Sequence, residues 1–293
     1  MCGIAGYVSA SAGRPADERI VDVMCQTIVH RGPNDQGVFI DGPVGIGMRR
    51  LSIIALSTGH QPISNETGTI WIVFNGEIYN YQDLAKDLSR RGHTFKTTSD
   101  TEVIVHLYEE YGEACVDHLR GMFAFAIWDR TGDRLFIARD RLGVKPLYYW
   151  WRNGQLVFGS ELKAVLAHPD VVPTLNAEGL LYYLRYFYIP DPLTIFQDIH
   201  KLPPGHTVSL TGGHLSVKSY WDGCLPKETD PQAITEDAAL ERLEYHLKEA
   251  TRVRLMSEVP LGAFLSGGID SSLTVALMAQ EMPPSGSSHA RSL

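Results

Sequence analysis

A cysteine at position 2 is the first residue whose placement suggests chemistry. Removal of Met1 would expose Cys2 with a free α-amino group. Such an amine has a reference pKa of about 7.7–8.0, so it can accept a proton near neutral pH. The thiol and its own amine would then supply nucleophile and base together, as in N-terminal threonine enzymes. Because most cysteines are structural or inert, this hypothesis needs companion residues elsewhere in the chain.

The stretch FNGEIYNY contains the first companions. A nucleophile that attacks an amide needs hydrogen-bond donors for the oxyanion that forms. Asn75 offers a side-chain amide and Gly76 a backbone N–H at the end of a predicted strand. An Asn-Gly pair is also typical of a plain turn, so the pair alone does not decide the function.

A free amino-acid substrate would need groups for its carboxylate and its ammonium. Arg50 can form a bidentate fork with a carboxylate. Glu77 and Asp100 can supply negative charge for the ammonium, although Asp100 would also suit the first turn of a helix. The sequence therefore offers a nucleophile, an oxyanion hole and a substrate clamp.

A second candidate site is LSGGIDSS at residues 265–272. Gly267 and Gly268 let the backbone approach a ligand, and the helix that follows would direct its N–H groups at an anion. Asp270 is a candidate to hold Mg²⁺ on a polyphosphate. The stretch has no GK[ST], so it is not a Walker loop, and an ordinary strand-to-helix turn is the alternative. The hydroxyl donors are Ser266, Ser271 and Ser272.

The elements that must position these residues are strands and short helices. Residues 44–53 and 69–81 are rich in β-branched and aromatic residues and predict strands. Residues 81–91 predict a helix that Gly92 ends. SDTE at 99–102 predicts a capping box, with Ser99 as N-cap and Glu102 three residues later. The helix after it would bury one face, formed by Val103, Ile104, Leu107, Tyr108 and Tyr111.

Two hairpins complete this region. Residues 122–129 and 134–140 flank the turn RTGD, and the second hairpin turns at Asn153 and Gly154. We therefore predict an α+β domain with antiparallel sheets. A second region, with an amphipathic helix at 235–255, a buried strand at 259–266 and a further helix, predicts the opening of a parallel α/β domain. The predicted boundaries are 2–210 for the first domain, 211–234 for a linker and 235–293 for the second.

Seven segments in order resemble the class II glutamine amidotransferase domain of the asparagine synthetase family: MCGIAGYV, HRGPNDQG, RRLSII, FNGEIYNY, TTSDTEVI, GMFAFAIWD and ARDRLGVKPLYY. The resemblance implies an N-terminal nucleophile hydrolase sandwich of two antiparallel sheets with flanking helices. It implies Cys2 as nucleophile, Asn75 and Gly76 as oxyanion hole, and a glutamine site of Arg50, Leu51, Ile53, Ile54, Glu77 and Asp100. Asn34 and Ala55 stand where the family often has an acid, and neither is an expected catalytic group.

VPLGAFLSGGIDSS resembles the PP-loop of ATP pyrophosphatases in the same family. The resemblance implies an ATP site at Leu265, Ser266, Gly267, Gly268, Asp270 and Ser271. It implies ATP with Mg²⁺ as co-substrate, no organic prosthetic group, and glutamine and aspartate as the other substrates. Ammonia from the first site would cross a tunnel to a β-aspartyl adenylate and give asparagine, AMP and pyrophosphate. Both sites would have to be shielded, because the adenylate would hydrolyse in water.

Composition excludes other classes. The formal net charge of −8 argues against a nucleic-acid partner, and no stretch is long and apolar enough for a membrane span. The four cysteines form no CxxC pair, and the eleven histidines show no spacing typical of a metal site. With no signal peptide, we expect a cytoplasmic protein, and the family commonly forms homodimers. An aromatic cluster is interpreted as core or domain interface: Tyr182, Tyr183, Tyr186, Phe187 and Tyr188.

The second region is short for a domain. One strand and one following helix cannot bury a doubly wound sheet, and the end is rich in Ser and Pro. We therefore expect a fragment or a frame-changed product that retains glutaminase activity alone. Two alternatives remain open: a relative that amidates another carboxylate, in a secondary-metabolite or surface-polysaccharide pathway, and a non-catalytic binding protein with a glutaminase fold.

Overall fold

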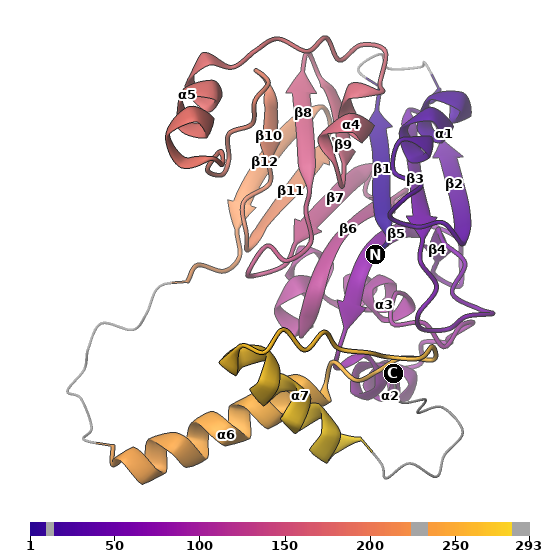
Figure 1. Ribbon diagram of the computed structural model, residues 1–293. Coiled ribbons are helices and arrows are strands. Elements are labelled where there is room, and N and C mark those ends of the chain that lie inside the picture. The colour runs from indigo at the N-terminus through magenta and orange to yellow at the C-terminus, as the bar shows by residue number, and fades with distance from the viewer. Residues whose placement is uncertain (10–14, 224–233, 283–293) are drawn as a thin grey trace. The chain divides into compact units, whose positions relative to one another are not determined.

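The computed structural model describes residues 1–9, 15–223 and 234–282 (Figure 1). The chain divides into two compact units, Met1–Gly223 and Cys224–Leu293. Part of the predicted linker, 224–233, and the Ser- and Pro-rich end, 283–293, lie outside the described residues.

Unit 1 is built on two six-stranded sheets, and every strand pairing in them is antiparallel. The first sheet has the order β10 (Ile199–Lys201), β8 (Tyr148–Arg152), β9 (Gln155–Gly159), β1 (Gly3–Val8), β3 (Val44–Arg50) and β2 (Asp35–Asp41). The second has the order β12 (His214–Ser219), β11 (His206–Thr211), β7 (Arg134–Arg139), β6 (Gly121–Asp129), β5 (Ile70–Ile78) and β4 (Ile63–Ser64).

Three apolar cores give unit 1 four layers. The sheets face one another across a core that holds Ile4 and Met48 from the first and Val73 and Ala126 from the second. The outer face of each sheet forms another core with the helices that cover it. The covering helices are α1 (Glu18–Gln26) and α4 (Leu162–Leu166) on the first sheet, and α2 (Tyr81–Arg90) and α3 (Glu102–Tyr111) on the second. The predicted sandwich of two antiparallel sheets with flanking helices is confirmed.

The alternation of side chains along the strands decides which residues reach the inter-sheet layer. Successive residues of a strand point to opposite faces. On β5, Ile72 and Phe74 pack toward the helices, whereas Val73 packs between the sheets. On β1 and β3, Ile4 and Met48 face the inter-sheet core. Residues two positions further along these strands point the same way, so their side chains meet at one end of the layer between the sheets.

Both predicted hairpins form. β6 and β7 pair across the turn that follows Asp129, and β8 and β9 pair across Asn153 and Gly154. These two turn residues have φ of 50° and 79°, which is the backbone that makes Asn-Gly favourable there.

The predicted capping box is wrong. α3 begins at Glu102 with Thr101 as N-cap, and no side chain caps it. The hydroxyl of Ser99 accepts the N–H of Thr101 at 3.1 Å, within the loop before the helix. The carboxylate of Glu102 accepts the N–H groups of Lys96 and Thr97 at 2.8 and 2.7 Å. It therefore binds that loop and not the N–H of Ser99, which a capping box requires.

Two other expectations in unit 1 also need revision. The linker predicted from residue 211 overlaps the second sheet, because β12 pairs with β11 over six residues. For the aromatic cluster at 182–188 the interpretation as core is wrong, since Phe187 is 83% exposed and Tyr188 60%, and the interpretation as domain interface stays a prediction. Its helix, α5 (Ala177–Tyr186), buries only Gly179, where an added Cβ would lie 2.3 Å from the carbonyl oxygen of Thr194. The remaining helical turn, η1 (Gly112–His118), follows α3.

Unit 2 contains two described helices, α6 (Glu236–Arg252) and α7 (Ile269–Glu281). The buried strand predicted at 259–266 is wrong: the segment forms no strand, and Phe264 is 99% exposed. A strand is stable only beside neighbours, and the described part of this unit supplies none. No helix in the described ranges is long and apolar enough to cross a membrane.

Candidate active site

Register places Cys2 beside Arg50. Gly3 pairs with Arg49 between β1 and β3, so the residues just beyond this pair are neighbours. The Sγ atom of Cys2 accepts the N–H of Leu51 at 3.3 Å and lies 3.6 Å from the carbonyl oxygen of Leu51. Cys2 and Arg50 continue the faces of Ile4 and Met48, so both side chains point into the end of the inter-sheet layer.

Arg31 fixes the backbone of Cys2. Its Nε donates to the Cys2 carbonyl at 2.9 Å, and its Nη1 donates to Glu161 at 3.0 Å. The sequence analysis missed this residue, although HRGP was among the segments that carried the resemblance. In the same segment, a Cβ on Gly32 would lie 2.3 Å from the Arg49 carbonyl carbon, so only glycine fits this close approach.

Asn75 is the most unusual polar residue of the site. It continues the inter-sheet face of Val73 on β5 and is 1% exposed. Neither its Oδ1 nor its Nδ2 has a hydrogen-bond partner among the residues that the structure describes. Leaving a buried amide unpaired costs about 1–3 kcal/mol, so such groups call for an explanation. A ligand oxygen beside Nδ2 supplies one.

Gly76 follows directly and pairs with Phe123 of β6. A Cβ at this position would lie 2.3 Å from the carbonyl oxygen of Met122, so a side chain cannot be accommodated without moving the strand. Glycine therefore keeps the backbone accessible where β5 reaches the cavity.

Arg50 is 6% exposed and organises the loop that follows β3. Its Nη2 donates to the carbonyls of Ile54 and Ala55 at 2.9 and 2.8 Å. Ala55 adopts φ of +53°, and Asn34 accepts the N–H of Ser52 at 3.1 Å. The two positions that depart from the family pattern thus shape this loop, while the guanidinium lines the cavity.

Asp100 is a buried carboxyl on the opposite wall. Its Oδ2 accepts the N–H of Ile78 at 3.0 Å, and the Ser99 hydroxyl lies 3.5 Å from Oδ1. Burial, reinforced by the nearby charge of Glu77, raises the pKa of Asp100 to about 7. The carboxyl therefore carries only part of its charge near neutral pH, and a bound cation would favour its ionised form.

Gln61, Thr101 and Lys145 also line the cavity and were missed by the sequence analysis. Gln61 accepts the N–H of Phe74 at 2.7 Å and donates to Thr101 Oγ1 at 3.2 Å, so it ties β5 to the loop of Asp100. Lys145 is 4% exposed, and burial lowers its ammonium pKa. The only available signal for Lys145 was its place in ARDRLGVKPLYY.

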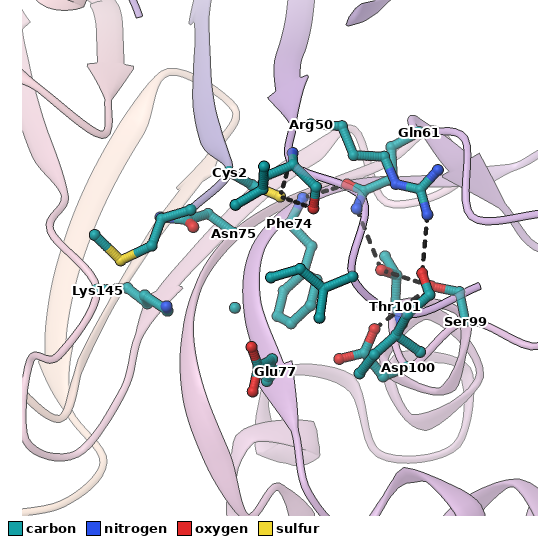
Figure 2. Close-up of a pocket in the computed structure, with 15 residues that line it drawn as sticks. Cys2, Arg50, Gln61, Phe74, Asn75, Glu77, Ser99, Asp100, Thr101 and Lys145 are labelled. Atoms are coloured by element: carbon teal, nitrogen blue, oxygen red, sulfur yellow. Dashed lines mark hydrogen bonds between the residues drawn. The ribbon is translucent and has the colours of Figure 1, made fainter. Parts of the chain in front are cut away.

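These side chains line one cavity (Figure 2). The structure brings together all nine residues predicted for the first site, while their chemical roles remain predictions. Burial raises the pKa of the Cys2 thiol, and burial lowers the pKa of the N-terminal amine at Met1. The nine residues are Cys2, Arg50, Leu51, Ile53, Ile54, Asn75, Gly76, Glu77 and Asp100.

The predicted second site lies in unit 2, before and in the first turn of α7. Gly267 has φ of +82°, and Ser271 Oγ lies 2.9 Å from Ser266 Oγ and donates to the carbonyl of Gly268 at 3.0 Å. Asp270 stands in the first helical turn. All six predicted residues, from Leu265 to Ser271, are exposed or partly exposed, so the structure gives a turn and a helix start without a closed pocket.

Comparison with known proteins matches two families to successive parts of the chain. The model of the glutamine amidotransferase domain family matches residues 1–221, and that of the asparagine synthase family matches residues 242–292. The chain is 40% identical over 288 residues to glutamine-hydrolyzing asparagine synthetase 1 of Bacillus subtilis (strain 168), covering 97% of this chain and 45% of that relative. It is 39% identical to asparagine synthetase 3 of the same organism, covering 98% and 46%. The chain thus spans about half the length of these relatives.

A likeness to a solved structure supports the fold. Glutamine phosphoribosylpyrophosphate amidotransferase from B. subtilis superposes with a TM-score of 0.55 at 18% identity, covering 95% of this chain and 64% of that one.

Proposed function

Because the chain belongs to the glutamine amidotransferase domain family, we propose that unit 1 hydrolyses glutamine to glutamate and ammonia with Cys2 as nucleophile. Removal of Met1 would give Cys2 its own α-amino group. That amine would take the thiol proton as Sγ bonds to the side-chain amide carbon of glutamine. The proton would then pass to the leaving nitrogen, so that ammonia departs and a thioester remains. Water would hydrolyse the thioester, forming the glutamate carboxylate and restoring the thiol.

The observation that carries this proposal is the unpartnered amide of Asn75 in the cavity that Cys2 lines. The tetrahedral intermediate needs a donor for its oxyanion, and a donor already desolvated and held by a strand requires no reorganisation. The backbone N–H of Gly76 is the second proposed donor. A purely structural asparagine would have found partners during folding, as most buried amides do.

Other residues of the same cavity suit the rest of glutamine. We assign Arg50 to the α-carboxylate, with the loop of Leu51, Ile53 and Ile54 as its wall. Glu77 and Asp100 would hold the α-ammonium. The raised pKa of Asp100, caused by burial and by Glu77, fits this assignment, because a bound ammonium would stabilise the ionised carboxylate.

For the longer protein that the relatives indicate, we propose glutamine-dependent asparagine synthesis. The relatives' printed name and the match over 242–292 support this extension. The loop from Leu265 to Ser271 would then hold the phosphates of ATP, with Asp270 toward Mg²⁺, and aspartate would be the acceptor. A cytoplasmic homodimer belongs to the same proposal and rests on the family resemblance alone.

The test is ammonia release from glutamine by the untagged chain, after mass spectrometry has confirmed loss of Met1. Cys2→Ala should abolish release. Cys25→Ala is the matched control, because it removes a thiol that is fully buried in the core of unit 1 and should keep activity. Release that persists in Cys2→Ala would refute the nucleophile assignment. A processed, folded parent chain without release would refute the proposal for this chain.

A further inference from the structure

A cluster of histidine and glutamate side chains lies outside the cavity of the proposed active site. Its members come from three segments of unit 1: Glu66 before β5, His93 after α2, and His106 with Glu109 on α3. One potential ligand atom from each residue lies within 4.8 Å of the other three. None of the four lines the cavity around Cys2, so the inference is independent of the proposed function.

The separations suit a single small cation. The Nδ1 of His106 lies 2.7 Å from Oε2 of Glu109 and 3.8 Å from Oε2 of Glu66. The Nδ1 of His93 lies 3.5 Å from the same Glu109 oxygen. A tetrahedral site with bonds of about 2.0–2.1 Å places its ligand atoms roughly 3.3–3.4 Å apart. Movements of well under 1 Å would bring these three measured pairs to that spacing.

The other polar atom of each carboxylate is already held. Oε1 of Glu109 accepts Nδ2 of Asn65 at 2.8 Å, and Oε1 of Glu66 accepts the N–H of Thr94 at 2.7 Å. Each acid therefore presents its Oε2 to the cluster. Hydrogen bonds of this kind, to the outer atoms of metal ligands, orient known sites.

Each imidazole also has a carboxylate behind it. His93 Nε2 lies 3.0 Å from Glu110, and His106 Nε2 lies 3.8 Å from Glu102. His106 is fully buried, and its Nε2 has no hydrogen-bond partner in the described part of the chain. If Nδ1 binds a cation, the ring proton must sit on Nε2, the nitrogen that faces Glu102. A hydrogen bond from the outer ring nitrogen to a carboxylate is usual for a metal-binding histidine, and His93 has one with Glu110.

The charge balance also favours a cation. Four carboxylates surround the two imidazoles: Glu66, Glu102, Glu109 and Glu110. Arg91 pairs with Glu110 at 3.4 Å. Even with both imidazoles protonated, this group would remain negative.

We propose that Glu66, His93, His106 and Glu109 bind one divalent cation of the zinc type. Two imidazoles with two carboxylates match the nitrogen and oxygen ligands of Zn²⁺, whereas Mg²⁺ and Ca²⁺ prefer oxygen alone. The side chain of Glu66 is 32% exposed and that of Glu109 22%, so an ion can enter from solvent. Bound metal would fasten the segments around Glu66 and His93 to α3, next to the loop held by Glu102.

The test uses Co²⁺ as a probe, because its visible absorption reports tetrahedral nitrogen and oxygen ligation. The full chain would carry Cys2→Ala, since an N-terminal thiol and amine can chelate metal by themselves. We expect one equivalent of Co²⁺ to bind and Zn²⁺ to displace it. His93→Ala and Glu109→Gln should each weaken binding by more than about 100-fold, the upper range for loss of an outer-shell partner.

His60→Ala is the matched control. His60 also pairs with a carboxylate, Asp35, at 2.6 Å, but it lies outside the cluster, so its loss should leave Co²⁺ binding unchanged. Circular dichroism would confirm that each variant is folded, and Glu109→Gln preserves side-chain size if His93→Ala fails to fold. Absence of tetrahedral Co²⁺ absorption in the folded parent, or equal binding by the parent and a folded cluster variant, would overturn the proposal.

Discussion

Asp100→Asn should stabilise unit 1 and weaken glutamine binding at the same time. The buried carboxyl has a pKa of about 7 in the folded protein against a reference of 3.8. Ionisation of Asp100 is therefore less favourable in the folded than in the unfolded protein. The resulting loss of unfolding free energy grows as pH rises from about 4 to 7. Each unit of pKa difference corresponds to about 1.4 kcal/mol. The charged group thus lowers the free energy of unfolding by about 4 kcal/mol at pH 8 and about 2 kcal/mol at pH 5.

Asparagine at position 100 keeps an oxygen for the Ile78 N–H but removes the charge. The free energy of unfolding of the variant should exceed that of the parent by nearly the whole of this loss at pH 8, and by less than half as much at pH 5. Urea unfolding monitored by tryptophan fluorescence measures this quantity for unit 1, because all five tryptophans of the chain lie in it. A variant that is less stable than the parent at pH 8, or gains equally at both pH values, would refute the account of the buried charge.

Glutamine affinity should change in the opposite direction. A hydrogen bond to a charged group contributes about 1.5–3 kcal/mol, so loss of the carboxylate should raise the Kd about 10- to 150-fold at pH 8. In the parent, affinity should fall about tenfold from pH 8 to pH 6 as the ionised fraction drops. The variant should lose this dependence. Calorimetry in a Cys2→Ala background, where glutamine is not consumed, compares the two, and equal Kd values would refute the role of Asp100 in the clamp.

Three further substitutions test the remaining walls of the cavity. Asn75→Ala should lower kcat for ammonia release by about 10²–10³ with a much smaller change in KM; an unchanged kcat would exclude Asn75 from the oxyanion hole. Gly76→Ala should lower the free energy of unfolding by about 1–3 kcal/mol in urea titrations, because its Cβ would lie 2.3 Å from the Met122 carbonyl oxygen; wild-type stability would contradict that clash. Arg50→Lys should raise the KM for glutamine about tenfold or more, since one ammonium cannot both keep the Nη2 contacts to the carbonyls of Ile54 and Ala55 and offer a planar fork to a carboxylate; an unchanged KM would remove Arg50 from the clamp.

Local sequence patterns identified much of unit 1 because they report short-range physics. Alternation and β-branched residues predicted β3, β5 and both hairpins, and the Asn153-Gly154 turn formed with positive φ. The same local reasoning failed at Ser99. A capping pattern is present there, but the carboxylate of Glu102 accepts the N–H groups of Lys96 and Thr97. It failed again at 259–266, since an apolar run becomes a strand only beside another strand.

The sequence by itself determined which chemistry the first site can attempt, through Cys2, Asn75 and Asp100, because those residue types carry the reactive and charged groups. Only the tertiary structure decided that Arg31 holds the carbonyl of Cys2 and that Lys145 lines the same cavity. It also brought together His93 and His106, whose spacing along the chain predicted no metal site. Such contacts depend on strand register and helix packing between segments far apart in the sequence, and no local pattern encodes them.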